Sequence, residues 1–276
     1  MSRTGQHSTS TSLAYEMYGD GVPVVFLHGL TFDRTTWRPI IERLGGHVRS
    51  IAVDLPGHGD TGGVACTLRE AAARVNSLLE TIGVDAPVVV GHSMSAGIAS
   101  IYAAQYPVCG LVNVDGGIDI RPLAEVLQRL ESVLRSDPFP AAFEPFQQSM
   151  GFDRVPEPDR SRALASQSIR RDVILGYWEE LMRSDASELQ SAIEAELAAI
   201  DAPCLGVFGH RLSSTERRHL REHLPQMQVE AWREGGHLVH LAEPDRFTAR
   251  LRTFIDQITT APGTSASTTS SAAPRT

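Results

Sequence analysis

Residues 87–105, PVVVGHSMSAGIASIYAAQ, carry the most informative pattern in the chain. The first four of these residues are all apolar, which is typical of a strand buried on both faces of a parallel sheet. Glycine, histidine and serine follow at positions 91–93, and the run of small and apolar residues from Met94 onward predicts a helix. The sequence therefore predicts a strand, a tight turn and a helix, with Ser93 in the turn.

Strand and helix patterns alternate on both sides of this stretch. Residues 22–27 form another continuous apolar run, and the spacing of apolar residues from Leu68 to Ile82 predicts a helix. That helix has a capping box at Thr67–Glu70 and a glycine, Gly83, at the position of a C′ residue. Further strands are expected at residues 13–17, 50–53, 111–114, 204–208 and 229–232, and further helices at 37–44 and 244–258. This alternation predicts an α/β fold with a mostly parallel, doubly wound sheet flanked by helices.

The long interval between the strands at 111–114 and 204–208 shows helical periodicity and no clear strand. A structureless loop of this length inside a compact domain is implausible. We therefore expect an inserted helical cap at residues 118–200, which divides an α/β core formed by residues 13–117 and 201–260. Residues 1–12 are a polar N-terminal tail, and residues 261–276, rich in Ser, Thr and Ala, predict a disordered C-terminal tail.

Composition excludes several classes of function. The chain has 276 residues, with 25 Lys+Arg against 33 Asp+Glu and a net charge of −8, which argues against binding nucleic acid or an anionic membrane. No apolar run approaches the length of a membrane span, and the polar N-terminus predicts no signal peptide. Its three cysteines are widely spaced, so we expect a cytoplasmic protein without disulfides. The partner that we expect is a small-molecule substrate. The oligomeric state of the protein cannot be read from the sequence.

The turn at residues 91–95, Gly-His-Ser-Met-Ser, fits the pattern G-x-S-x-small. The pattern alone is weak, but here it follows a predicted strand and precedes a predicted helix. That context is the one in which a nucleophilic serine is exposed on a sharp turn, because small flanking residues leave room for the backbone. We therefore interpret Ser93 as a nucleophile.

Three other segments extend this pattern. Together the four segments are residues 28–30 (HGL), 54–59 (DLPGHG), 91–95 (GHSMS), and 235–237 (GGH) with Glu243-Pro244 downstream. In this order the chain resembles the α/β-hydrolase superfamily of esterases, lipases and C–C hydrolases, over about residues 13–118 and 203–258. The predicted cap lies at the family's usual insertion point.

The resemblance implies a set of site residues. It makes Ser93 the nucleophile and His237 the base that takes the serine proton. It also implies an oxyanion hole formed by two backbone N–H groups, on Leu30 and on Met94.

The acid departs from the common pattern of the family. Most members carry it in the loop after the penultimate strand, here residues 209–214, but Leu212 stands where an aspartate is usual. Glu216, the first carboxylate there, reads as part of a capping box with Ser213. A minority of the family places the acid one strand earlier, and Asp115 fits because it directly follows the strand 111–114. Asp119 is the competing candidate.

Three other groups of residues are better explained by structural roles than by catalysis or metal binding. Asp54 lies in a turn that the family shares, where it shapes the backbone, and His92 reads as a buried residue beside the nucleophile. His219, Glu222 and His223 match H-x-x-E-H, a metalloprotease helix motif, but their charged surroundings predict a solvated helix face. We expect no metal and no organic cofactor.

The expected activity is hydrolysis of a small or medium ester-type bond, a carboxylic ester or lactone, through an acyl-enzyme on Ser93. Thioesters, C–C bonds and cofactor-free perhydrolysis stay open, because the resemblance covers all of them. Arg121 and Arg211 could each bind a substrate carboxylate. The alternatives are a lyase or cyclase that uses the same triad, and a ligand-binding receptor with little turnover.

Overall fold

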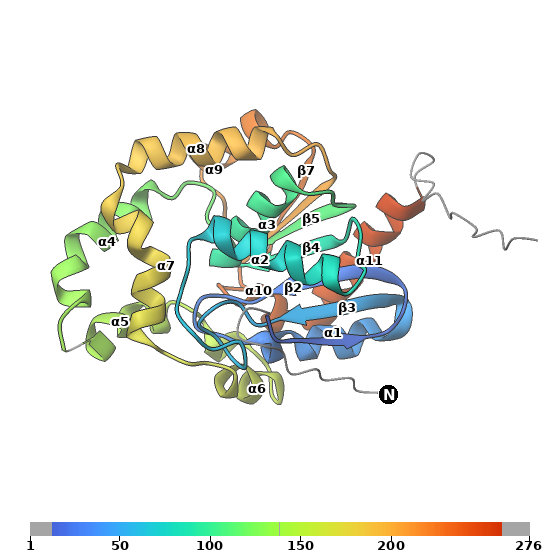
Figure 1. The fold of residues 1–276 in the computed structure, drawn as a ribbon, viewed down its shortest axis with the longest axis horizontal. Helices are drawn as coiled ribbons and strands as arrows, with labels where there is room; N and C mark the ends of the chain where they lie inside the picture. The colour runs from blue at the N-terminus through green and yellow to red at the C-terminus, as the bar shows by residue number, and fades with distance from the viewer. Residues whose placement is uncertain (1–12, 138, 261–276) are drawn as a thin grey trace, which may run out of the picture.

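A computed structural model describes residues 13–137 and 139–260, so the two predicted tails lie outside the described residues. Its centre is a seven-stranded sheet in the order β1-β3-β2-β4-β5-β6-β7 (Figure 1). Only β1 runs antiparallel to its neighbour, and every other described pairing is parallel. The strands are β1 (Tyr15–Tyr18), β2 (Val22–Leu27), β3 (Val48–Val53), β4 (Val88–His92), β5 (Gly110–Val114), β6 (Cys204–Phe208) and β7 (Met227–Ala231).

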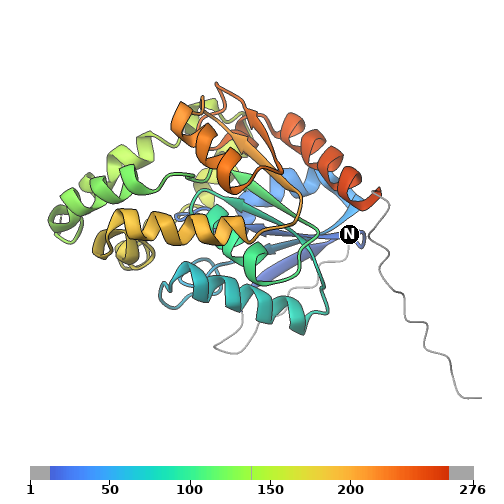
Figure 2. The same ribbon diagram turned by 90° about the horizontal axis from the view of Figure 1, so that it is seen from above.

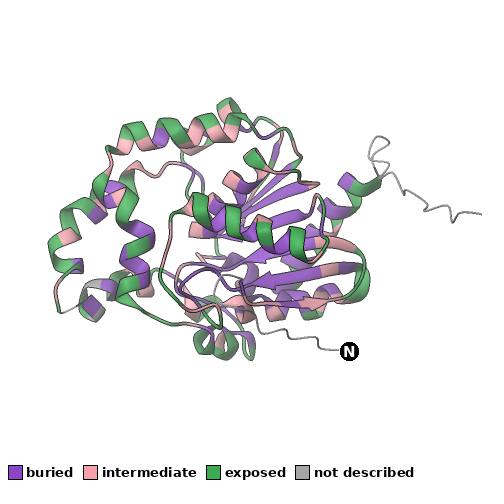
Figure 3. Ribbon diagram, in the orientation of Figure 1, coloured by how far each residue is buried: buried purple, intermediate pink, exposed green. Residues whose placement is uncertain are grey.

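Helices cover both faces of the sheet, as Figure 2 shows with α2 on one side and α11 on the other. Alternate residues of β2 enter separate cores: Val25 and Leu27 pack with α2 and α3, whereas Val24 and Phe26 pack with α1 and α11. Every residue of β4, β5 and β6 is buried, which explains their apolar sequences (Figure 3). The core helices are α1 (Arg38–Leu44), α2 (Leu68–Thr81), α3 (Met94–Gln105), α9 (Ser214–His223), α10 (Val239–Ala242) and α11 (Pro244–Thr260).

The strand order places the carboxyl ends of β2 and β4 at the switch point of the sheet. The chain leaves β2 toward β3 on one side, and returns to β4 on the other side of β2. Connections that diverge in this way open a crevice at the carboxyl edge, where open α/β sheets bind ligands. The segment that follows β2 and the residue that follows β4 therefore meet at this crevice.

The chain between β5 and β6 is helical, and its described residues contain no strand. It holds α4 (Arg121–Leu134), α5 (Phe139–Gln148), α6 (Asp159–Ala165), α7 (Arg171–Arg183) and α8 (Ala186–Ala198). In Figure 1, α4, α5 and α7 lie to one side of the sheet. Their apolar cluster, which includes Phe143 and Trp178, also takes in Phe32 and Leu238 from the loops after β2 and β7. The helical insertion therefore packs over the carboxyl edge. Its last helix, α8, packs on α3 and α9 of the core.

The predicted fold class is confirmed, and most predicted elements agree with the structure within two residues. Shifts of two residues occur at single ends, as in β7, which begins at Met227 rather than at residue 229. No described helix combines the length and the apolar character needed to cross a membrane.

The capping box of α2 forms as predicted. The Thr67 side chain accepts a hydrogen bond from the Glu70 N–H at 3.1 Å, and the Glu70 carboxylate accepts one from the Thr67 N–H at 2.9 Å. We expect Thr67→Ala to lower the free energy of unfolding by about 1 kcal/mol, because an N–H at the helix start loses its partner. Urea unfolding measures this change. Thr67→Ser is the control and should retain most of the stability; an equal loss in both variants would contradict the capping role.

Candidate active site

Ser93 is the single residue between β4 and α3. Its backbone has φ 57° and ψ −122°, a conformation that non-glycine residues rarely adopt. Close packing surrounds the turn: a Cβ at Gly91 would lie 2.1 Å from the Ser95 carbonyl oxygen, and one at Gly116 would lie 2.2 Å from the Ala96 Cβ. The glycine of the G-x-S-x-small pattern is therefore required because a side chain at position 91 would clash with the next turn of backbone. The turn holds the Ser93 hydroxyl at the carboxyl edge of the sheet.

A continuous chain of hydrogen bonds runs from Ser93 to Asp115. His237 Nε2 lies 2.8 Å from Ser93 Oγ, and His237 Nδ1 lies 2.8 Å from Asp115 Oδ2. An ionised carboxylate can only accept, so Nδ1 carries the proton and Nε2 is left to accept from the serine hydroxyl. This is the arrangement in which an imidazole can act as a general base toward a serine.

Asp115 follows β5 directly and also has a positive φ, of 50°. Its Oδ1 accepts from the Gly209 N–H at 2.8 Å and lies 3.1 Å from His210 Nδ1. Burial would raise the pKa of the Asp115 carboxyl, but the hydrogen bonds from His210, His237 and Gly209 outweigh it and hold that pKa well below its usual range. The carboxylate is therefore ionised across the neutral pH range.

The competing carboxylates have other partners. Asp119 forms a bidentate pair with Arg121, with Nε–Oδ1 at 2.8 Å and Nη2–Oδ2 at 2.7 Å. Glu216 caps α9 with Ser213, as its sequence pattern predicts. Of the candidate acids, the structure brings only Asp115 to His237 within the described part of the chain. The same pairing also occupies Arg121, one of the two arginines considered for a substrate carboxylate.

The two backbone N–H groups predicted for the oxyanion hole lie on the loops that follow β2 and β4. Met94 is the first residue of α3, where helix N–H groups have no intrahelical partner. Neither the Leu30 N–H nor the Met94 N–H donates to another described residue. The Leu30 backbone is fixed by its carbonyl, which contacts His58 Nε2, and the next carbonyl, of Thr31, accepts from the Ser168 N–H of the helical insertion at 2.7 Å.

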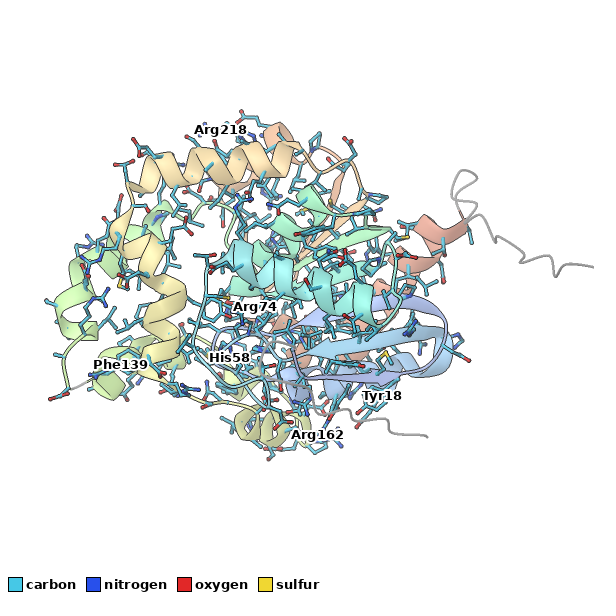
Figure 4. The ribbon with its side chains drawn as sticks, viewed as in Figure 1. Tyr18, His58, Arg74, Phe139, Arg162 and Arg218 are labelled. Carbon is cyan, nitrogen blue, oxygen red and sulfur yellow. The ribbon has the colours of Figure 1, made fainter. Side chains whose placement is uncertain are left out.

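His58 links this loop to the insertion. Its Nδ1 lies 3.1 Å from the Pro56 carbonyl, and its ring is 5.6 Å from that of Tyr177 in α7. Figure 4 labels His58, which belongs to the turn at 54–59. The Tyr177 hydroxyl donates to the same Pro56 carbonyl at 2.9 Å. The turn at 54–59 therefore joins the loop that carries Leu30 to α7. Its first residue, Asp54, is fully buried and accepts from the Arg34 N–H at 2.7 Å, which agrees with a structural role.

Two buried histidines support the loop that carries His237. His92 Nε2 donates to the His237 carbonyl at 2.9 Å, and the rings of His92 and His240 lie 4.6 Å apart. Burial lowers the pKa of His92 to about 3 and the pKa of His240 well below its ordinary value, so both imidazoles are neutral. His92 is therefore a buried structural residue, as expected. The His240 ring lies 4.6 Å from that of Trp37, in the core behind the site.

Apolar side chains border the site on the side of the insertion. Leu30 and Phe152 are partly exposed and pack against the cluster formed by α4, α5 and α7, as do Phe146 and Leu181. The Phe32 ring lies 6.2 Å from that of His92 and 6.1 Å from that of Phe152. Through Phe32, the apolar wall formed by these side chains reaches His92, the residue before Ser93.

The H-x-x-E-H motif lies on α9. His219 Nδ1 and His223 Nε2 each lie 3.8 Å from a carboxylate oxygen of Glu194 in α8. Within residues 13–137 and 139–260, no group of three or more His, Cys, Asp or Glu side chains is arranged to hold a metal ion.

His210 is the residue of the site that sequence reasoning missed. It lies in the loop after β6, and its Nδ1 contacts the Asp115 carboxylate. The prediction for this loop depends on carboxylates, and a histidine two residues before Leu212 carries no such signal. The pairing of β5 with β6 brings this loop next to Asp115.

Comparisons with known proteins agree with this fold. A family model described as "Alpha/beta hydrolase family" matches residues 24–250. A 2-succinyl-6-hydroxy-2,4-cyclohexadiene-1-carboxylate synthase of Serratia proteamaculans is 26% identical over 245 residues, which cover 84% of this chain and 92% of the relative. A 2-(acetamidomethylene)succinate hydrolase of Mesorhizobium japonicum is 32% identical over 118 residues, 41% of this chain and 42% of that protein. A thermophilic esterase from Thermogutta terrifontis has a similar structure, with a TM-score of 0.70, 24% identity, and coverage of 94% of this chain and 99% of the esterase.

The two glycines after Asp115 provide a matched test of the packing around the turn. A Cβ at Gly116 would also lie 2.9 Å from the Ser93 carbonyl oxygen, whereas a Cβ at Gly117 would meet nothing within 4 Å. We expect Gly116→Ala to lower the free energy of unfolding by about 2 kcal/mol through overpacking. Gly117→Ala should leave it unchanged. Urea unfolding of the two variants checks the pair, and equal effects would show that the Gly116 contact does not limit the turn.

Proposed function

Because this chain belongs to the alpha/beta hydrolase family, we propose that it is a serine hydrolase that cleaves a small or medium ester-type bond, a carboxylic ester or lactone. Ser93 is the nucleophile, His237 the base and Asp115 the acid. The observation that carries the proposal is the hydrogen-bond chain from Asp115 through His237 to Ser93, with 2.8 Å at each step. Its serine lies on the strained turn between β4 and α3, where the hydroxyl is presented to a substrate.

The geometry supports a two-step acyl transfer. Ser93 Oγ attacks the carbonyl carbon while His237 Nε2 takes the hydroxyl proton, and the carbonyl oxygen becomes an oxyanion held by the N–H groups of Leu30 and Met94. When the C–O bond breaks, His237 returns the proton to the departing alcohol. A water molecule then gives a proton to His237 and attacks the acyl carbon; as the bond to Ser93 Oγ breaks, His237 returns that proton to Ser93 and the acid product is released. Asp115 holds the imidazole in the required tautomer and stabilises its protonated form.

The position of Asp115 after β5 is compatible with this mechanism because β5 is the immediate neighbour of β4. The Ser93 N–H donates to the Val114 carbonyl at 2.9 Å, and the Asp115 N–H donates to the Val207 carbonyl at 2.9 Å. These bonds continue the sheet one residue past each strand. The serine and the acid therefore sit on adjacent strand ends, and His237 reaches both from the loop after β7.

The apolar wall favours a substrate of modest polarity. The half-buried side chains of Leu30, Phe146, Phe152 and Leu181 provide apolar surface for an acyl or alcohol group of small or medium size. The helical insertion at 118–200 supplies three of these four residues, so we propose that it acts as a cap that sets specificity.

A substrate that carries a carboxylate is the second candidate, and one observation favours it. Arg154 is exposed and donates through Nη1 to the Glu234 carbonyl at 3.1 Å, and this Nη1 lies 3.4 Å from where a Cβ of Gly236 would be. A cation therefore lies beside the loop that ends in His237. The relatives named as a carboxylate synthase and a succinate hydrolase have carboxylates in their substrates or products by name. A lyase or cyclase that uses the same triad without hydrolysis is grouped with this candidate. A ligand-binding receptor with little turnover would form the acyl-enzyme on Ser93 but would not release the acid product.

Labelling with a fluorophosphonate, read by intact mass, tests the nucleophile and the acid together. We expect one adduct on the wild type, none on Ser93→Ala, and labelling of Asp115→Asn slowed by up to ~10⁴-fold because the imidazole loses its oriented tautomer. Asp119→Asn is the matched control and should label at the wild-type rate. Loss of labelling in Asp119→Asn with retention in Asp115→Asn would overturn the assignment of the acid.

Arg154→Leu separates the two substrate classes. If the substrate is a neutral ester or lactone, kcat/KM for p-nitrophenyl butyrate should stay within twofold of the wild type. If it carries a carboxylate, kcat/KM for a succinate monoester should fall roughly 10- to 100-fold, the effect of losing a hydrogen bond to a charged group. Wild-type enzyme that turns over the succinate monoester poorly would reject the second candidate.

A further inference from the structure

Asp115 is shared by two histidines. One oxygen, Oδ2, faces His237 Nδ1 at 2.8 Å, and the other, Oδ1, faces His210 Nδ1 at 3.1 Å. His210 comes from the loop between β6 and α9, and its side chain is about half exposed. The mechanism proposed above uses His237 and leaves His210 without a role.

The partners of His210 determine its protonation. Its Nδ1 faces the Asp115 carboxylate and its Nε2 lies 3.3 Å from Glu216 Oε1. Ionised carboxylates have no proton to donate, so both ring nitrogens must carry hydrogen, which makes the ring an imidazolium. Both carboxylates are held ionised by other donors as well, Asp115 by the Gly209 N–H and Glu216 by the Ser213 N–H at 2.7 Å.

Electrostatics agree with this geometry. The hydrogen bond with Asp115 raises the pKa of His210 to about 9; partial burial opposes this rise, and the contact with Glu216 adds to it. The groups that face the ring are Asp115 from the end of β5, Glu216 from α9, and the apolar ring of Phe208 from β6 at 6.0 Å. His237 lies beyond Asp115, and the nearby His92 and His240 are neutral.

We propose that His210 is a fixed imidazolium that positions Asp115 and offsets part of its negative charge, so that His237 remains an effective base at lower pH than it would beside an unshared carboxylate. Only the second half of this inference, the effect on His237 as a base, rests on the proposed function. It deepens that function by making His210 a positioning residue, which acts on the substrate through Asp115 and His237.

The physical reason is a competition for one carboxylate. A lone carboxylate stabilises a neighbouring imidazolium strongly and so favours the protonated, inactive form of the base. A cation on the second carboxylate oxygen weakens that stabilisation without removing the hydrogen bond that orients the base. Oδ2 keeps the hydrogen bond that orients His237, whereas Oδ1 faces the positive charge of His210. Orientation of the base and reduction of the negative charge are therefore assigned to different oxygens.

The protonation of His210 is tested without turnover. In Ser93→Ala, ¹⁵N NMR of the histidine rings should show both nitrogens of His210 protonated at pH 7.5, with a titration midpoint above pH 8. Glu216→Gln should lower that midpoint by about one pH unit, because one of the two carboxylates is removed while Gln can still complete the capping box. A His210 ring with one bare nitrogen at pH 7.5 would overturn the proposal.

The effect on the base is tested by the pH dependence of kcat/KM for p-nitrophenyl butyrate. In His210→Gln, which can donate a hydrogen bond but carries no charge, the midpoint of the acid limb should rise by roughly half to one pH unit. The matched control is His47→Gln, the same change at an exposed histidine between α1 and β3. An acid limb that does not move in His210→Gln would refute the electrostatic role.

The pH dependence of the unfolding free energy gives a third readout, which can be measured even if His210→Gln has little activity. The ordinary histidine pKa of 6.5 rises to about 9 in the folded protein, so the stabilisation by His210 is fully present below pH 6.5 and is lost as the pH rises through about 9. The difference in unfolding free energy between wild type and His210→Gln should shrink over that window, and a constant difference would count against the imidazolium. If NMR finds the imidazolium but Ser93 takes no fluorophosphonate, the proposed function fails while the protonation of His210 stands.

Discussion

The structure around the site holds the one-residue connection between β4 and α3 in place. Ser93 adopts a backbone conformation that is unfavourable for a residue with a side chain, so its neighbours must hold it there. The buried strand before it, the helix after it and the close approach of Gly91 and Gly116 all do so. The same turn lies at the switch point of the sheet, which is the position at which open α/β sheets bind their ligands.

Sequence patterns predict the sheet and its flanking helices because each element obeys a local rule. Continuous apolar runs mark strands that the structure buries on both faces, and the boxes at Thr67 and Ser213 mark the starts of α2 and α9. Three segments far apart in the chain also point to Ser93, His237 and Asp115, which the fold brings into one hydrogen-bond chain. The contact of His210 with Asp115 could not be predicted, because it depends on the pairing of β5 with β6 and on no spacing within the chain.

The position of Asp115 gives the loop after β6 a supporting role. The loop supplies the Gly209 N–H and the His210 ring to a carboxylate at the end of the neighbouring strand, β5. The loop is held close to its partner by sterics as well, since a Cβ at Gly209 would lie 1.8 Å from the Gly236 carbonyl oxygen. Glycine at 209 thus lets the loops after β6 and β7 approach, and that approach brings Asp115 and His237 together.

The hydrogen bonds of the site join residues that are distant in the chain. His237 is 144 residues from Ser93 and 122 residues from Asp115, and the whole helical insertion lies between the acid and the base. Local elements such as α2 can form early in folding, whereas contacts with such large loops form slowly because closing them costs chain entropy. Ser93, Asp115 and His237 can therefore meet only after β6 and β7 have joined the sheet. The distance between His237 and Ser93 thus reports on the last step of refolding, and a ribosome-bound chain that stops before β7 contains Ser93 and Asp115 but lacks His237.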